Sequence, residues 1–293
     1  MKKTQSTDNS GPQQLNLTEI IRKRIGGRKG KLIPGFLLRS LERLIRQEEL
    51  NEMLRIAYPA KGSEFSRRIL KHLGISLSVK GLDRLPDGKA YIFASNHPLG
   101  GLDGISLVAI LGEKYGDKNL RVMVNDLLMN VEPLSGVFLP VNKFGSQGRE
   151  SSRLLNAALE DGKQIVMFPA GLVSRLHKDG SINDLEWQKS FVSKAIEFKR
   201  EIVPVRFEGK NSMKFYKTAR LRKRLGLKIN VEQALLPSEV CKSQGKSFVV
   251  SFGKPINPET YRKAGKNPKE IAAGIREAVC GLDKGEDGKI KGE

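Results

Sequence analysis

Two patterns of apolar residues divide the chain near residue 80. In the first, apolar side chains recur at three- and four-residue spacing, at Phe36, Leu37, Leu41, Leu44 and Ile45. This is the period of an amphipathic helix, with Arg39, Arg43 and Arg46 on its other faces. The pattern predicts a helical extension over residues 15–79. Such a helix either packs on the main domain with a solvated basic face or lies on an anionic membrane, and the sequence leaves both open.

Past residue 80, short apolar runs alternate with amphipathic stretches. The runs predict strands over Ala90–Ala94, Leu120–Val124, Ile165–Phe168, Ile202–Phe207 and Phe248–Phe252. The amphipathic stretches predict helices over Gly104–Lys114, Glu150–Leu159, Trp187–Phe198 and Pro268–Cys280. Buried apolar strands separated by helices are typical of an α/β sheet with helices on its faces. We therefore predict an α/β domain over residues 80–293 after the helical extension, and a polar, disordered tail over residues 1–14.

The charge balance narrows the choice of partners. The formal net charge is +20 and the pI is about 10.0, so nucleic acid, acidic membrane surfaces and acidic carrier proteins all qualify. The N-terminus has no apolar signal core, and the longest strongly apolar stretch, Ile105–Leu111, is shorter than the roughly 20 residues of a spanning helix. Cys241 and Cys280 lie far apart and are expected to be reduced. These features predict a cytoplasmic protein, peripheral on the inner face of the membrane.

The candidate chemistry centres on His97, which follows the apolar run Tyr91–Ala94. Asp103 comes in the same loop, and Gly100 and Gly101 between them let the backbone bend. Imidazole takes up a proton near neutral pH, and a carboxylate can hold its Nδ1–H tautomer so that Nε2 accepts a proton. The stretch therefore predicts a general base, His97, oriented by Asp103.

With Asn96 included, this stretch resembles the first motif of the glycerolipid acyltransferase family, Asn-His-x4-Asp, whose members acylate lysophospholipids and glycerol phosphates. Five residues rather than four separate His97 from Asp103, and the glycine pair can loop out the additional one. The resemblance assigns the two catalytic roles to this pair, and it assigns Asn96, Gly100 and Gly101 to substrate binding.

A second cluster, Gly136–Lys143, resembles the family's second motif, in which an arginine follows a glycine and apolar residues. Asn142 stands in the place of the arginine and Lys143 follows it. The resemblance implies that Asn142 and Lys143 help to hold an acceptor phosphate or carboxylate, with the lysine as a point charge and not a bidentate fork. The alternative interpretation is an edge strand that ends in a solvated lysine.

A third cluster, Phe168-Pro169-Ala170-Gly171 followed by Ser174, is similar to the family's Phe-Pro-Glu-Gly-x-x-Ser motif, with alanine in place of the glutamate. That replacement, together with the Asn-His-Pro-Leu-Gly-Gly upstream, resembles a bacterial branch that acylates lyso-ornithine or lyso-glycine lipids. The resemblance implies that Phe168, Pro169, Gly171 and Ser174 bind substrate. A strand end followed by a turn is the alternative interpretation, because proline and glycine are common there.

Two further features complete the resemblance. Arg175 can neutralise an anionic head group, and Ile202–Val205 is similar to the family's last motif, an apolar pair around a proline. The motifs imply a central mixed sheet flanked by helices, with an N-terminal helical extension. They imply transfer of a fatty acyl group from an acyl-carrier protein or acyl-CoA thioester to a lyso-lipid hydroxyl, with no cofactor and no covalent acyl-enzyme. Backbone N–H groups are expected to stabilise the oxyanion near Gly100, Gly101 or Gly171.

A basic run covers Lys214–Lys228, with seven Lys or Arg residues and no acidic one. Phe215, Tyr216, Leu221 and Leu225 are interleaved with the charges. The pattern predicts a basic amphipathic helix suited to phospholipid head groups or an acidic acyl-carrier protein. Nucleic-acid binding, which is the less favoured partner, and a solvated helix face are the alternatives.

Two other functions compete with acyl transfer. A non-enzymatic basic protein would bind RNA or anionic membranes. A thioesterase or lipase would use His97 with another nucleophile, although no Gly-x-Ser-x-Gly elbow occurs in the sequence. His72 and His177 are expected at the surface, so no metal site is predicted.

Overall fold

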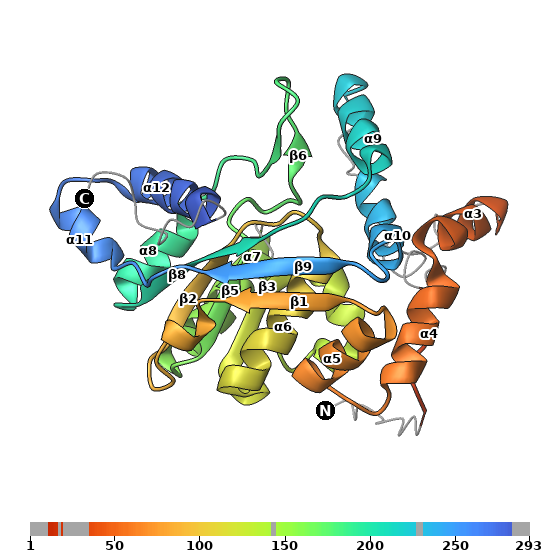
Figure 1. The fold of residues 1–293 in the computed structure, drawn as a ribbon, viewed down its shortest axis with the longest axis horizontal. Helices are drawn as coiled ribbons and strands as arrows, with labels where there is room; N and C mark the ends of the chain where they lie inside the picture. Colours follow the sequence, from red (N-terminus) through yellow and green to blue (C-terminus); the bar gives the residue numbers. More distant parts are fainter. Residues whose placement is uncertain (1–10, 17–18, 20–34, 142–144, 227–230, 283–293) are drawn as a thin grey trace.

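A seven-stranded sheet lies at the centre of the protein, in the order β1-β9-β8-β2-β5-β3-β4 (Figure 1). The computed structural model describes residues 11–16, 19, 35–141, 145–226 and 231–282. The strands of the sheet are β1 Ser76–Lys80, β2 Tyr91–Ser95, β3 Leu120–Asn125, β4 Phe138–Val141, β5 Gln164–Met167, β8 Glu201–Phe207 and β9 Ser247–Phe252. Neighbouring strands are parallel except for β8 and β9, so the predicted mixed sheet is confirmed.

Helices cover both faces of the sheet (Figure 1). The α-helices of the described chain are α3 Gly35–Ile45, α4 Gln47–Ala57, α5 Gly62–His72, α6 Gly101–Tyr115, α7 Gly145–Glu160, α8 Ser190–Glu197, α9 Met213–Arg224, α10 Leu236–Cys241, α11 Pro258–Lys263 and α12 Pro268–Gly281. On β2, Tyr91 and Phe93 join a core cluster that includes α5 and α6 side chains, whereas Ile92 and Ala94 join one that includes α8 and α12 side chains. Alternate residues of this central strand therefore face opposite layers, which explains its continuous apolar run.

The predicted strands and helices all fall on observed elements, although several ends differ. Helix α8 begins at Ser190 and not at Trp187, which lies in the preceding loop. Strand β4 is an edge strand, as the alternative interpretation of Gly136–Lys143 had it. The hairpin of β6 Arg175–Leu176 and β7 Ile182–Asn183 was not predicted from the sequence, and it projects beyond the sheet (Figure 1).

The N-terminal segment is helical only in part. Helices α3, α4 and α5 confirm the periodicity, but Ser76–Lys80 forms β1 and pairs with β9, so the helical interpretation of residues 76–79 was wrong. The alternation of Leu77 and Val79 with polar residues is the strand signal at this place. Leu44 of α3 is 38% exposed, while the side chains of several other apolar positions in α3 lie outside the described residues.

The predicted tail, residues 1–14, lies outside the described residues up to position 10. Beyond it, the Gln13 side chain donates to the Asn130 carbonyl (2.6 Å) and accepts from the Glu132 N–H (2.9 Å). Gln13 is therefore in contact with the body of the protein, and the disorder of the rest of the tail stays a prediction.

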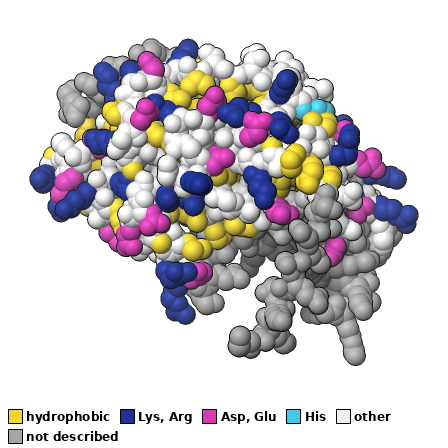
Figure 2. Space-filling view, turned by 90° about the horizontal axis from the view of Figure 1, so that it is seen from below, with side chains coloured by type: hydrophobic (Ala, Val, Ile, Leu, Met, Phe, Trp, Pro, Cys, Tyr) yellow, Lys and Arg dark blue, Asp and Glu magenta, His cyan; other side chains and the backbone are white. Residues whose placement is uncertain are grey.

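Charge and hydropathy vary over the surface. Seen from below the sheet, Lys and Arg side chains are intermingled with Asp and Glu, so the positive net charge does not make this face uniformly basic (Figure 2). Within the described part of the chain, no helix combines the length and the apolar character needed to cross a bilayer.

Candidate active site

The loop that carries His97 follows β2, which lies between β8 and β5 in the sheet. The Asn96 side chain anchors this loop, because its Nδ2 donates to the Phe207 carbonyl (3.0 Å) and its Oδ1 accepts from the Phe207 N–H (2.7 Å). The side chain thus continues the pairing of β2 with β8 past the end of the strand. Both polar groups of the Asn96 amide are used in this way, so Asn96 positions the loop, and its predicted contact with substrate stays a prediction.

His97 and Asp103 form the predicted pair. The distance from His97 Nδ1 to Asp103 Oδ2 is 2.9 Å, with the imidazole 18% exposed and the carboxylate fully buried. The same Oδ2 accepts the N–H groups of Leu99 (3.0 Å) and Gly100 (2.9 Å). Asp103 lies in the first turn of α6, where a negative charge interacts favourably with the helix dipole. The additional residue of the motif therefore leaves the carboxylate in contact with the ring.

Gly100 makes this arrangement possible. Its φ of 87° is a conformation that residues with a side chain rarely adopt, and a Cβ there would come within 3.0 Å of Leu236 and 3.3 Å of Val173. The turn lets the Leu99 and Gly100 N–H groups point at the carboxylate just before α6 begins at Gly101.

Burial and hydrogen bonding act in opposite directions on Asp103. Removal from water raises the pKa of the Asp103 carboxyl, and the hydrogen bonds from the His97 ring and from the Leu99 and Gly100 N–H groups oppose that rise. When the Asp103 carboxylate is ionised, it only accepts hydrogen bonds, and His97 Nδ1 carries the hydrogen between them. In the neutral imidazole of that tautomer, Nε2 has the lone pair that a general base requires.

The third motif lies against the pair. The Phe168 ring is 4.1 Å from the His97 ring, centre to centre, at an angle of 31°. Gly171, with a φ of 68°, closes the turn by donating its N–H to the Phe168 carbonyl (2.9 Å). Pro169 and Ala170 are buried within this turn. The resemblance to the family motif therefore corresponds to a real contact in space.

A buried carboxylate that the sequence analysis missed supports the His97 loop. Asp184 accepts the His97 N–H (3.2 Å) and the Ser174 hydroxyl (2.6 Å) on Oδ1, and the Trp187 indole N–H (3.0 Å) on Oδ2. The Ser174 N–H also donates to the His97 carbonyl (2.8 Å). Ser174 therefore positions the loop, and its predicted contact with substrate stays a prediction. The one tryptophan of the chain, whose buried N–H needs an acceptor, is the signal that pointed to a carboxylate nearby.

Arg175 lies in a buried ion-pair cluster. Its Nη2 is 2.9 Å from Glu232 Oε1, and Arg222 Nε is 2.9 Å from Glu232 Oε2. Glu232 is fully buried, and the side chains of Arg175 and Arg222 are only 12% and 16% exposed. Arg175 therefore has a partner inside the protein, and its predicted contact with a head group stays a prediction.

The remaining predicted residues lie elsewhere or outside the described part. Gly101 is the first residue of α6 and lies between His97 and Asp103 in the sequence. Asn142 and Lys143 lie outside the described residues, so their predicted contacts with the acceptor stay predictions.

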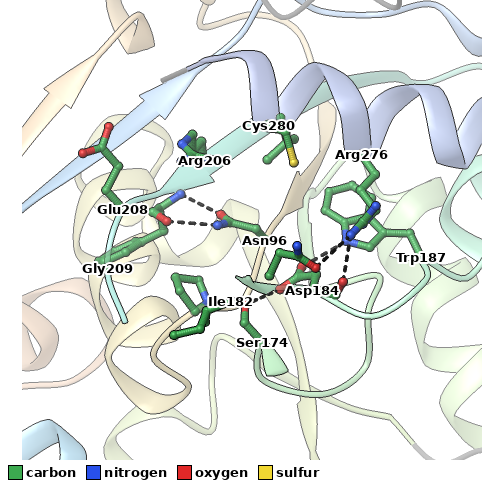
Figure 3. Close-up of a pocket in the computed structure, with 14 residues that line it drawn as sticks. Asn96, Ser174, Ile182, Asp184, Trp187, Arg206, Glu208, Gly209, Arg276 and Cys280 are labelled. Atoms are coloured by element: carbon green, nitrogen blue, oxygen red, sulfur yellow. Dashed lines mark hydrogen bonds between the residues drawn. The ribbon is translucent and has the colours of Figure 1, made fainter. Parts of the chain in front are cut away.

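A cavity of about 330 Å³ lies beside the loop (Figure 3). Asn96, Pro98 and Asp184 line it, together with Trp187 and Arg276. Arg276 donates to the Asp184 carbonyl (2.8 Å), so the wall of the cavity is the same network that supports His97. The His97 ring is not part of its lining.

The protein has an α/β fold with a His–Asp pair at the carboxyl end of a central strand, an arrangement that suits general-base chemistry. The chain matches the family model described as Acyltransferase over residues 25–282, and it belongs to this acyltransferase family. This membership favours the enzymatic function over the non-enzymatic alternative.

Two relatives are each named lyso-glycine lipid O-acyltransferase. The one from Phocaeicola vulgatus is 41% identical over 264 residues, which cover 90% of this chain and 94% of the relative. The one from Bacteroides thetaiotaomicron is 38% identical over 268 residues, which cover 92% and 97%. Among solved structures, the 1-acyl-sn-glycerophosphate acyltransferase PlsC from Thermotoga maritima is similar over 91% of this chain and 95% of that chain, with 16% identity and a TM-score of 0.47.

Proposed function

We propose that this acyltransferase moves a fatty acyl group from an acyl thioester to the hydroxyl of a lyso-aminolipid of the lyso-glycine lipid type. The contact of 2.9 Å between His97 Nδ1 and Asp103 Oδ2 is the observation that carries the reaction type. The acceptor class is supported by the names of the two relatives and by the full-length match to them.

The proposed reaction is a direct transfer. His97 Nε2 removes the proton of the acceptor hydroxyl while the hydroxyl oxygen bonds to the thioester carbonyl carbon. Asp103 stabilises the imidazolium that forms. The carbon–sulfur bond then breaks, and the departing sulfur takes the proton back from His97. The products are an ester and a free thiol, and no nucleophilic Ser or Cys is needed.

Backbone N–H groups near Gly101 are the best candidates for stabilising the oxyanion. The Gly100 N–H donates to Asp103 and the Gly171 N–H donates to Phe168, so both are already used. Gly101 begins α6, and the N–H groups of the first helical turn have no acceptor within their own helix. We therefore narrow the oxyanion site to the first turn of α6.

Ala170 supports an acceptor without a glycerol phosphate. The family motif has a glutamate that contacts the acceptor, whereas Ala170 is buried beside Phe168 and offers no polar group. The donor is an acyl-carrier protein or acyl-CoA. The net charge of +20 favours an acidic carrier, although both donors are anionic. We propose that the reaction takes place at the inner face of the membrane.

The test uses purified protein with labelled acyl-carrier protein or acyl-CoA and a panel of acceptors: lyso-glycine lipid, lyso-ornithine lipid and lysophosphatidic acid. His97→Ala is assayed in parallel. The expected result is label in the acylated lyso-glycine lipid with the wild-type protein and none with the variant.

Each of three other outcomes contradicts part of the proposal. Transfer only to lysophosphatidic acid would overturn the acceptor class. Labelled free fatty acid without any acceptor would indicate a thioesterase. Transfer that persists in a folded His97→Ala variant would overturn the role of His97.

A further inference from the structure

Helix α9 projects from the body next to the β6–β7 hairpin (Figure 1). One of its faces is buried, with Phe215 and Tyr216 fully covered. Met213, Leu221 and Leu225 are 47%, 56% and 63% exposed, and they are the three most exposed large apolar side chains of the described chain. Exposed apolar side chains that gather on one projecting element mark an interaction surface.

These apolar side chains share one stripe with basic ones. Met213, Lys217, Leu221 and Leu225 follow each other at four-residue spacing and therefore lie on the same side of α9. The helix carries no acidic residue, and its six basic residues are Lys214, Lys217, Arg220, Arg222, Lys223 and Arg224. We call this exposed side, with Leu225 at its end, the α9 face. On the face seen in Figure 2, by contrast, Lys and Arg side chains are intermingled with Asp and Glu side chains.

Buried contacts connect the α9 face to the active site. Glu232 pairs with Arg222 of α9 and with Arg175 of β6, and the Arg175 guanidinium lies 5.5 Å from the centre of the Phe215 ring. The residue before Arg175 is Ser174, which donates to the His97 carbonyl. Helix α9 is therefore held in a defined position relative to the catalytic loop.

We infer that the α9 face docks on an anionic lipid surface, with Leu221 and Leu225 in the acyl boundary and exposed basic side chains such as Lys217 and Arg224 at the head groups. The inference rests on the proposed function, because it assigns the surface that brings this active site to its lipid acceptor. The transfer of a leucine side chain from water into hydrocarbon lowers the free energy, and so does the attraction of Lys and Arg to the negative potential of an anionic membrane. A helix with both features lies in the interface.

The exposure of the α9 side chains and the shape of the helix favour a lipid surface over nucleic acid or an acidic protein. Single-stranded nucleic acid is bound through aromatic side chains that stack on its bases, but Phe215 and Tyr216 are buried. Binding to the phosphates of a nucleic acid would leave the exposed Leu221 and Leu225 side chains in water. An acidic protein needs a complementary surface of a size that a single projecting helix does not offer, whereas a lipid layer adapts its shape to what enters it.

The test is sedimentation with phosphatidylcholine vesicles that contain or lack phosphatidylglycerol. The full chain should bind the anionic vesicles, and added salt should weaken that binding. The double variant Leu221→Gln/Leu225→Gln should bind them at least tenfold more weakly. Val79→Gln is the matched control, because Val79 is 40% exposed on edge strand β1 and lies outside the α9 face. It should bind as the wild type does.

A second readout separates this inference from the proposed function. The double variant should retain turnover of a short-chain, water-soluble lyso-acceptor and lose most turnover of the same head group embedded in vesicles. If neither acceptor is acylated by the wild type, the proposed function fails while the vesicle experiment still decides the docking.

Two results would overturn the docking proposal. One is a double variant that binds anionic vesicles as tightly as the wild type. The other is a double variant that loses binding to acyl-carrier protein or to RNA while its vesicle binding is unchanged.

Discussion

Asp103 Oδ2 accepts three hydrogen bonds: one from the His97 ring and one each from the Leu99 and Gly100 N–H groups. An amide oxygen can accept the same bonds, but it lacks the negative charge. Asp103→Asn should therefore keep the loop in place and lose the stabilisation of the imidazolium. We expect kcat to fall by roughly 10²- to 10⁴-fold, the range for general acid–base catalysis.

The control for this variant is Asp117→Asn, which makes the same change at a carboxylate that accepts the Ser63 N–H at the start of α5. Steady-state acyl transfer measures both variants. A near-normal kcat for Asp103→Asn would show that Asp103 is only a structural cap of α6.

The buried state of Asp103 also predicts how stability depends on pH. Its pKa is raised above the ordinary value of 3.8, so the folded protein holds this proton more tightly than the unfolded chain does. The resulting stabilisation is full below pH 3.8 and is lost as the pH rises through the folded-state pKa. The free energy of unfolding of Asp103→Asn, relative to wild type, should therefore increase with pH in that window. Urea unfolding at a series of pH values measures this, and a decrease would show that the hydrogen bonds outweigh burial.

At the scale of elements, the turn between β2 and α6 depends on Gly100. Gly100 and Gly180 have φ values of 87° and 85°, but a Cβ at Gly180 would meet no atom within 4 Å, whereas one at Gly100 would press on Leu236 and Val173. Gly180→Ala should cost only the backbone strain of about 1–2 kcal/mol. Gly100→Ala should cost about 1–3 kcal/mol more through overpacking and should lower kcat, because it moves the donors of Asp103. Chemical denaturation and activity compare the two, and equal losses would contradict the steric argument.

The Arg175–Glu232–Arg222 cluster joins the β6–β7 hairpin to α9 and to the 3₁₀ helix η5, Val231–Leu235. Glu232→Gln would leave two largely buried guanidinium groups without their counter-charge. We expect it to lower the free energy of unfolding by about 3–5 kcal/mol.

Glu150→Gln is the comparison for this change, since it removes the exposed Glu150–Arg153 pair on α7. We expect this variant to lower the free energy of unfolding by only about 0–1 kcal/mol. Urea titrations of both variants give the two values. A loss below 1 kcal/mol in Glu232→Gln would mean that solvent or rearrangement compensates the cluster.

At the scale of the whole molecule, Asp184 draws together segments that are far apart in the sequence. It accepts bonds from His97, Ser174 and Trp187, and its carbonyl accepts from Arg276 of α12. Asp184→Ala removes the side-chain acceptor of three donors. The free energy of unfolding should fall by about 1–3 kcal/mol for each buried donor that is left unpaired. It should also displace His97 and lower kcat about 10²-fold with little change in KM.

Asp184→Asn keeps an oxygen that can accept from part of this set, so it should restore part of kcat. Asp179→Ala, which removes a carboxylate from the exposed turn of the hairpin, should change neither stability nor kcat. If KM rises instead while kcat is unchanged, Asp184 acts on acceptor binding and not on the position of His97.

Local relationships in the sequence were enough to predict five strands of the central sheet, β2, β3, β5, β8 and β9, and the contact between His97 and Asp103. Tyr91–Ala94 and Ile165–Phe168 are continuous apolar runs, because both faces of the central strands are covered by helices. His97 and Asp103 share one loop, so their spacing and the glycines between them were enough to predict the contact. Phe168 follows β5, which is adjacent to β2, and parallel neighbours bring their carboxyl ends together.

Only the tertiary structure decided which polar groups support the site and which face outward. Asp184 meets His97 across 87 positions of sequence, and Glu232 meets Arg175 across 57. No periodicity or motif encodes such pairings, because they depend on where the hairpin, α9 and η5 pack. Ser174 and Arg175 were therefore predicted as substrate contacts, although packing had already given each a partner. In α9 the aromatic and the leucine side chains look equivalent in the sequence, and burial on one side of the helix is what separates them.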